Sequence, residues 1–379
     1  MLALALALCV FAPAAKADLA GTLYFTTFNG DFAVNNSVNN VFSVNFSYTC
    51  AVGCGPGGTF IQGSNTAIFK ANGADGIAFY PTNSANLLIA GQEQNNVTQI
   101  TTAGVLVTSV KADSAGSTTP PTGDPQAFHL AITPDNHNLL AIPNEQGAGA
   151  NSIDVLPLGA TTVSAGTART VTGVDTALRG IDFCLAGLCA GNAYYTNALD
   201  NNLGDFGLLA TPLTTPTTSL VTITNSGCGT ANGEGCLPAH GIVWDAFTNT
   251  FIIVSQNQVW QLQQTGATTW NVVSKFVDTA HPNDVFDQPS VDGAGHLFVA
   301  DAGTGGNILF IDYTSGSHLV GAASNFVYEH FLANSLDDIV NKAGVTTQTP
   351  EPTSILLFGS AMALAATVLR RRKAKGSRG

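Results

Sequence analysis

Six positions of the 379-residue sequence carry side chains that suit metal or ligand binding, and they recur every 47 to 61 residues. They are Asp75, His129, Arg179, His240, Asp287 and Asp338 (or its neighbour Asp337). Carboxylates suit Ca²⁺ and an added imidazole admits Zn²⁺, so Asp75, His240 and Asp287 are the candidate ligands of a divalent cation. Arg179 opposes a bare cation unless a carboxylate neutralises it. The structural alternative is that the aspartates accept backbone N–H bonds in tight turns and the histidines pack.

These residues belong to a phrase that repeats at 75–91, 128–142, 240–255 and 287–301, with a degenerate copy at 179–196. Each copy has a short apolar strand, a turn of Pro, Asp, Asn or Gly, and a second apolar strand. Third strands are predicted at 97–100, 152–156, 258–262 and 307–312, and fourth strands at 105–111 and 271–277. Repeats of about 40–50 residues built from four strands are typical of propeller blades. A β-sandwich or β-helix would not repeat at this length.

The two ends of the body predict how the ring closes. Residues 336–340 match the first strand of a blade, and the remaining strands of that blade would come from 23–28, 41–46 and 67–70. A blade shared by both ends removes open sheet edges. We therefore expect an all-β, six-bladed propeller over 18–342, with seven blades as the alternative. The first strand of each blade lines the channel of a propeller, which places the six candidate residues together at one mouth.

The repeated phrases resemble those of NHL-repeat and gluconolactonase-like six-bladed propellers. The resemblance implies one divalent metal held in the channel by a Glu, an Asn and an Asp. Asp287 falls where the Asp would be, His240 falls where the Asn would be, and no Glu lies near 23–28. Because two of three ligands differ, we predict a binding or structural protein rather than an enzyme. A metal-dependent hydrolase of a lactone or sugar ester is the alternative.

The composition excludes several other classes. Hydrophobic residues make up 45% of the chain and charged residues only 10%. Six of the 13 Lys and Arg lie in the last ten residues and Lys16 lies in the leader, so the body at 18–342 has six basic residues against 24 of the 25 acidic ones. A body this acidic does not bind a nucleic-acid backbone, and its apolar content is too high for disorder. We expect a monomer.

Both ends of the sequence indicate export. Residues 1–17 have the apolar core of a signal peptide and a small-x-small cleavage pattern ending at Ala17. After a linker at 343–349, residues 350–379 contain Pro350, Glu351 and Pro352, an apolar stretch at 354–369 that predicts a transmembrane helix, and a basic tail. This pattern resembles the PEP-CTERM sorting signal, with a plain tail anchor as the alternative. The resemblance implies a Gram-negative bacterium, processing by an exosortase, transient anchoring in the inner membrane, and delivery to the cell surface or an exopolysaccharide matrix.

The number and spacing of the cysteines also indicate an exported protein. Apart from Cys9 they form three close pairs, Cys50 with Cys54, Cys184 with Cys189, and Cys228 with Cys236. An even number of locally paired cysteines in an exported chain predicts disulfides that staple loops. The alternative of a metal site needs closer Cys or His clustering than these spacings give.

Overall fold

The computed structural model describes residues 19–27, 40–50, 56–71, 73–112, 127–143, 151–171, 178–197, 203–206, 222–224, 239–303, 305–315, 318–319 and 325–345. The predicted signal peptide and the sorting signal, with Ala17, Pro350, Glu351 and Pro352, lie outside the described residues. Within the described residues, no helix is long and apolar enough to cross a membrane. The only helical segments there are two short 3₁₀ turns, η1 (Gln92–Gln94) and η2 (Gly187–Cys189).

The repeated phrase folds into antiparallel sheets, written here from the innermost strand outward. Two sheets in the first half are β5 (Ala74–Phe79), β6 (Asn86–Gly91), β7 (Asn96–Thr101) and β8 (Leu106–Lys111), then β9 (Ala127–Ile132), β10 (Asn138–Pro143), β11 (Asn151–Pro157) and β12 (Thr167–Val171). A third sheet is β13 (Leu178–Phe183), β14 (Ala193–Asn197) and β15 (Leu203–Phe206).

Two sheets follow in the second half of the chain. They are β17 (Ile242–Asp245), β18 (Thr250–Ser255), β19 (Gln258–Gln264) and β20 (Thr269–Val277), then β21 (Phe286–Val291), β22 (His296–Asp301), β23 (Asn307–Asp312) and β24 (Phe326–Phe331). The short strand β16 (Thr222–Thr224) pairs in parallel with β20 at the outer edge of its sheet. The third strands expected from the sequence are therefore β7, β11, β19 and β23. The two expected fourth strands are β8, which lies outside β7, and β20, which lies outside β19.

The sixth sheet is shared by the two ends of the described chain, as the sequence predicted. Its order is β25 (Leu336–Val345), β1 (Leu19–Thr27), β2 (Val41–Thr49) and β3 (Thr59–Gln62), and β4 (Thr66–Phe69) also pairs with β2. Strand β25 pairs antiparallel with β1, with Leu23 opposite Asn341. Because β25 extends to Val345, it continues three residues beyond the predicted end of the body at 342.

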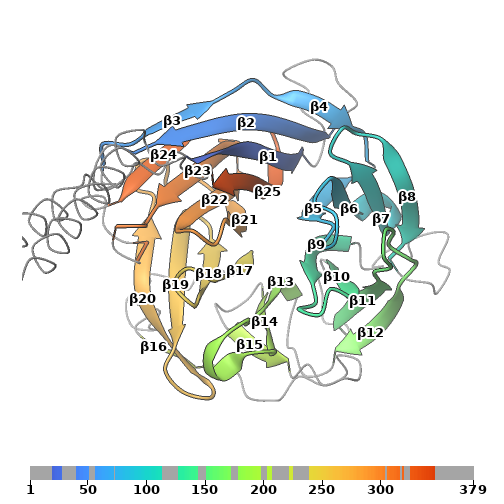
Figure 1. Cartoon of the computed structure of the whole chain (residues 1–379). Coiled ribbons are helices and arrows are strands. Elements are labelled where there is room, and N and C mark those ends of the chain that lie inside the picture. The colour runs from blue at the N-terminus through green and yellow to red at the C-terminus, as the bar shows by residue number, and fades with distance from the viewer. Residues whose placement is uncertain are drawn as a thin grey trace, which may run out of the picture.

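The innermost strands contact one another in a closed order, β25, β5, β9, β13, β17, β21 and back to β25, and Figure 1 shows the sheets radiating from this ring. The all-β propeller expected from the sequence is confirmed. The blade count differs slightly from the predicted six. Five sheets have four or more strands, whereas β13–β15 has three in the described part of the chain, because β16 joins the next sheet instead.

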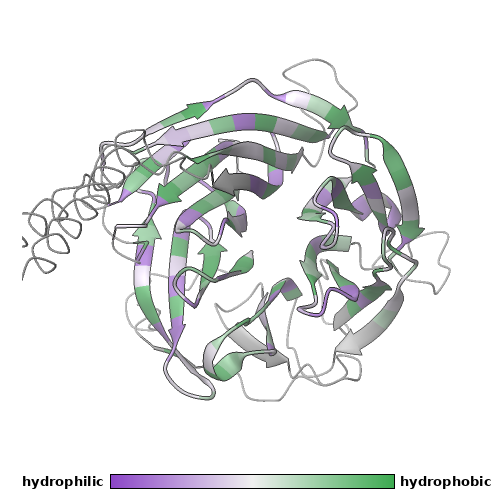
Figure 2. Cartoon of the chain, viewed as in Figure 1, coloured by the Kyte–Doolittle hydropathy of each residue, from purple (hydrophilic) through white to green (hydrophobic). Residues whose placement is uncertain are grey.

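The core lies between neighbouring blades. Figure 2 shows hydrophobic and hydrophilic residues alternating along many strands, which is the period-two pattern of a strand. Phe46 of β2 contacts Phe298 of β22, with ring centroids 5.1 Å apart, so the closing blade packs face to face on the preceding one. Ile252 of β18 likewise shares a buried cluster with Leu297 of β22. This packing fixes the positions at which the innermost strands begin.

One of the predicted disulfides is present among the described residues. Cys184 is bonded to Cys189, and the bond closes the short connection between β13 and β14. Cys50 is also disulfide-bonded. The residue bonded to Cys50 is not among the described residues. Cys54, Cys228 and Cys236 all lie outside them.

Candidate functional site

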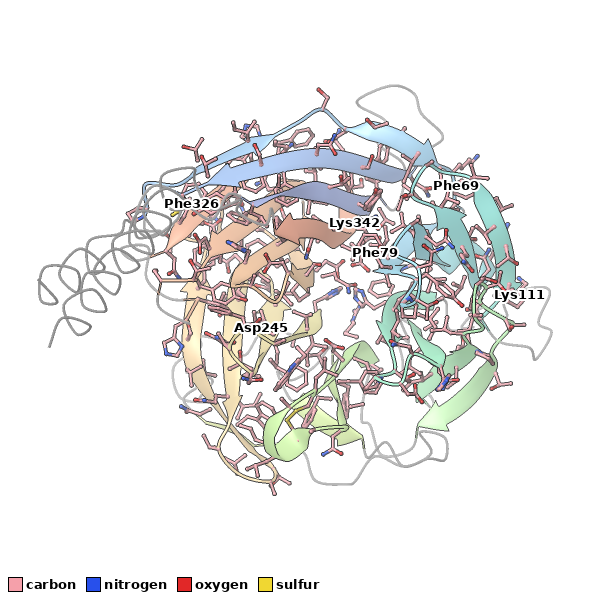
Figure 3. The ribbon with its side chains drawn as sticks, in the orientation of Figure 1. Phe69, Phe79, Lys111, Asp245, Phe326 and Lys342 are labelled. Carbon is pink, nitrogen blue, oxygen red and sulfur yellow. A yellow bond between two sulfur atoms is a disulfide. The ribbon has the colours of Figure 1, made fainter. Side chains whose placement is uncertain are left out.

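The innermost strands bring all six candidate residues to the centre of the ring. Asp75, His129, Arg179, Asp287 and Asp338 lie on β5, β9, β13, β21 and β25, and His240 immediately precedes Gly241 and β17. Side chains extend from these strands into the centre (Figure 3). Neighbouring strands are held close together there. For example, Thr26 Oγ1 donates to the carbonyl oxygen of Asp75 at 2.6 Å and accepts from the Asp338 N–H at 3.1 Å.

Asp287 binds two histidines from other blades. His240 Nδ1 forms a short hydrogen bond with Asp287 Oδ1, and His129 Nε2 lies 3.3 Å from the same oxygen. Burial alone would raise the pKa of the Asp287 carboxyl, but the two imidazoles outweigh burial and hold the pKa well below its usual range. Asp287 is therefore the ionised centre of this part of the ring. The His240 side chain keeps 19% of its surface exposed, whereas those of His129 and Asp287 keep 3% each.

His129 links Asp287 to a second carboxylate. Its Nδ1 lies 3.1 Å from Asp338 Oδ2. Burial alone would lower the pKa of His129, but the adjacent Asp338 and Asp287 raise it well above its usual value. With the Gln288 amide turned so that its nitrogen faces Asp338, that nitrogen donates to the same Asp338 oxygen at 2.6 Å.

Asp75 and Asp337 form a crowded pair of carboxyl groups. Gln92 Nε2 donates to Asp75 Oδ2, but Asp75 Oδ1 and Asp337 Oδ2 are buried without a hydrogen-bond partner among the described residues. Burial, followed by the negative charges of Asp337, Asp338 and Asp287, raises the pKa of Asp75 well above its usual value. Burial, and next Asp287, raises the pKa of Asp337 in the same way. These two groups therefore hold a proton or require a cation.

Arg179 supplies the permanent positive charge at this site. Its guanidinium carbon lies 5.6 Å from the centre of the Phe128 ring, a cation–π distance. Burial lowers the pKa of Arg179, and the negative charges of Asp287 and Asp75 oppose that change. The carboxylates whose negative charges act on Arg179 are thus the same groups that could hold a metal ion.

The predicted metal ligands divide between two groups that share His129. One group is His129, His240 and Asp287, and the other is Asp75, His129 and Asp338. Within each group the ligand atoms lie within 4.8 Å of one another. Both sets mix carboxylate oxygen with imidazole nitrogen and include a buried carboxylate, so the residues present fit a divalent cation. His129 was not among the three predicted ligands, although it was among the six candidates.

The turn interpretation of these aspartates does not hold for the ring. Asp245 and Asp292, at the ends of strands, do accept backbone N–H bonds, from Phe247 at 3.0 Å and from Ala294 at 2.8 Å. Within the described part of the chain, Asp75, Asp287 and Asp338 bind side chains instead.

Sequence reasoning missed Gln92 and Gln288 as members of the site. Gln288 directly follows Asp287 at the recurring position, so the repeat itself carried that signal. Gln92 lies beyond the second strand of its blade, in η1, and no pattern in the sequence distinguishes it.

No protein-family model matches the sequence, and no curated protein matches it. Solved structures with a similar fold include a candidate 6-phosphogluconolactonase from Bacteroides fragilis, 15% identical with a TM-score of 0.51, covering 86% of this chain and 98% of that chain. A protein of unknown function from Bacteroides caccae is 11% identical with a TM-score of 0.51, covering 85% and 98%. The periplasmic gluconolactonase of Pseudomonas aeruginosa is 15% identical with a TM-score of 0.48, covering 86% and 99%. At these identities the likeness shows the fold alone.

Proposed function

We propose that this chain is an exported β-propeller whose central ring binds a divalent cation, Ca²⁺ or Zn²⁺, and that it serves as a binding component of the cell surface or exopolysaccharide matrix. The observation that carries the proposal is the excess of buried carboxylates in the ring. Asp75, Asp287, Asp337 and Asp338 meet there. A buried charge is costly unless it is paired or coordinates a metal, and a cation relieves the repulsion among these groups.

Cation binding is tested by titrating the chelator-treated full-length chain with Zn²⁺ and with Ca²⁺ in a calorimeter. Asp287→Asn should weaken binding at least tenfold, because it removes the carboxylate that both histidines contact. Asp135→Asn is the matched control, since Asp135 pairs with His137 on the surface, where the two side chains are 59% and 77% exposed. Equal affinity in the Asp287→Asn variant and the wild type would contradict a cation in the ring.

The export half of the proposal is supported by the sequence patterns at residues 1–17 and 350–379. Deleting 350–379 should release the propeller into the medium, and replacing Pro350, Glu351 and Pro352 by alanine should block processing by the exosortase while the chain stays in the inner membrane. Cell fractionation and immunoblotting measure both outcomes. Unchanged surface retention after the deletion would show that these residues are not the sorting signal.

Hydrolysis is the second candidate function, and the His240–Asp287 pair favours it. A buried carboxylate that fixes Nδ1 of a partly exposed imidazole leaves Nε2 available as a general base, and Arg179 could hold an anionic group of a substrate. Lactones and sugar esters are the substrates to assay. Turnover that His240→Gln abolishes would establish this function, whereas turnover that survives the substitution would exclude His240 as the base.

A further inference from the structure

A second cluster of ligating side chains lies away from the centre of the ring. It comprises Asp278, His281, Asp284 and Glu329, and is called the rim cluster here. The first three residues belong to the connection from β20 to β21, which joins two blades, and Glu329 lies on β24, the outermost strand of the second blade. The cluster therefore spans the junction between two blades.

The rim cluster has the dimensions of one coordination sphere. Each of its four residues offers a ligand atom, and these atoms all lie within 4.8 Å of one another. His281 Nδ1 is 3.0 Å from Asp278 Oδ2 and 2.9 Å from Glu329 Oε2. Metal–ligand bonds of about 2.0–2.5 Å place the ligands of one ion at similar separations.

Unpaired buried oxygens distinguish this cluster from an ordinary group of surface acids. Asp284 is 5% exposed, and its Oδ2 has no hydrogen-bond partner among the described residues. Asp301, whose charge acts on Asp284, is fully buried, and its Oδ2 is unpaired in the same part of the chain. The other oxygen of Asp301 accepts from the N–H groups of Val285 and Gly303, both at 2.8 Å, so that residue also holds the connection in place.

The positive charge available to the rim cluster is small. In the described part of the chain, every ion pair uses a histidine, and His281 is the one that contacts these carboxylates. Three acidic groups with one imidazole thus leave a net negative charge for a bound ion to neutralise.

We propose that Asp278, His281, Asp284 and Glu329 form a second divalent-cation site that fastens the β20–β21 connection to strand β24. Three carboxylates with one imidazole suit Mn²⁺ or Zn²⁺ better than Mg²⁺, which prefers oxygen ligands and retains its waters. The His281 side chain is 47% exposed, so an ion reaches the site from solvent. The site's role is structural: the ion adds a link between the β20–β21 connection and strand β24.

The test measures ion stoichiometry and melting temperature in the full-length chain, first treated with chelator and then titrated with Zn²⁺, the ion proposed for both sites. Wild type should bind two ions, one in the ring and one at the rim, and should melt at a higher temperature when loaded. Glu329→Gln and His281→Gln should each weaken rim binding at least tenfold and reduce the gain in melting temperature. Because His281 is half exposed, its substitution leaves the fold intact even if Glu329→Gln does not.

The variant Asp287→Asn separates this proposal from the ring proposal. It should remove the ring ion and leave the rim ion, whereas the two rim variants should do the reverse. If wild type binds one ion that only Asp287→Asn removes, or if both rim variants bind like wild type, the rim site is overturned while the ring survives. One ion that only the rim variants remove would overturn the ring instead. No bound ion in wild type would overturn both.

Discussion

The central ring and the rim cluster use the same residue types but are assembled in different ways. Every blade contributes a residue to the ring, from strands that are far apart in the sequence and meet only when the propeller closes. The rim cluster takes three of its four residues from one short connection and the fourth from β24. The ring therefore depends on closure of the whole propeller, whereas the rim cluster depends on one junction between two blades.

The two clusters also differ in how they balance charge. In the ring, His129, His240 and Arg179 face the carboxylates, and among the described residues of the ring the carboxyl oxygens buried without a donor are Asp75 Oδ1 and Asp337 Oδ2. At the rim, His281 is half exposed and contacts Asp278 and Glu329, and no other basic side chain in the described part of the chain pairs with these carboxyl groups. Burial makes each ring contact energetically large, while solvent screening makes each rim contact small.

The largest effect is expected from removing the charge at the centre of the ring. Asp287→Asn leaves two imidazoles, one of them fully buried, without their shared carboxylate, and breaking a buried pair costs about 3–5 kcal/mol. Chemical denaturation at neutral pH should show this loss in the free energy of unfolding, whereas Asp135→Asn should cost less than about 1 kcal/mol. A similar small cost for both variants would show that the ring is not tightly coupled to the fold.

The next effect concerns the backbone on which the ring is built. Gly76 follows Asp75 on β5, and a methyl group there would clash with the carbonyl oxygen of Phe128 on β9. Backbone atoms cannot rotate away as side chains do, so Gly76→Ala should cost about 3 kcal/mol, as overpacking does. Gly57→Ala is the control, because a methyl group there meets nothing within 4 Å. A thermal shift for Gly76→Ala no larger than that of the control would show that close strand contact is not required.

The repeat made most of the ring predictable, because its residues occupy equivalent places in successive copies of one phrase. Periodicity was enough to predict the propeller and the blade shared by both ends. It gave no means of choosing the ligand partners: His129 lies one residue later in its copy than Asp287 does, yet the two side chains meet across the ring. The rim cluster was not predicted, because Asp278, His281 and Asp284 lie in a connection without a repeated pattern and Glu329 approaches them only through the pairing of β24 with β23.

A smaller effect, at Asp182, separates the influence of burial on a carboxyl pKa from the influence of neighbouring carboxyl groups. Asp182 on β13 accepts N–H bonds from Trp244 at 2.6 Å and Phe183 at 2.8 Å, and burial raises its pKa to about 6 even though those bonds lower it. Because the folded pKa lies above the usual 3.8, the folded state binds the proton more tightly. The proton bound by Asp182 therefore stabilises the folded state fully below about pH 4, and this stabilisation is lost as pH rises through 6. From pH 4 to 7, wild type should lose about 2 kcal/mol relative to Asp182→Asn.

If the free energy of unfolding of Asp182→Asn and of wild type changed with pH in the same way, the proton binding would be assigned to the crowded ring carboxyl groups instead. Urea denaturation of both proteins at each pH, in the presence of chelator, makes the comparison. The chelator keeps the ring and rim free of cations, so that the difference between the two proteins reports on Asp182.

The smallest effect is expected at the rim in the absence of cations. His281 is half exposed and its ion pairs with Asp278 and Glu329 are screened by solvent, so His281→Gln in chelator should change the free energy of unfolding by less than about 1 kcal/mol. Urea denaturation at neutral pH measures this change against Asp287→Asn in the same buffer. A loss as large as that of Asp287→Asn would mean that the blade junction depends on the imidazole itself. A small loss leaves the carboxyl groups of the connection, and the cation they are proposed to bind, as what fastens the junction.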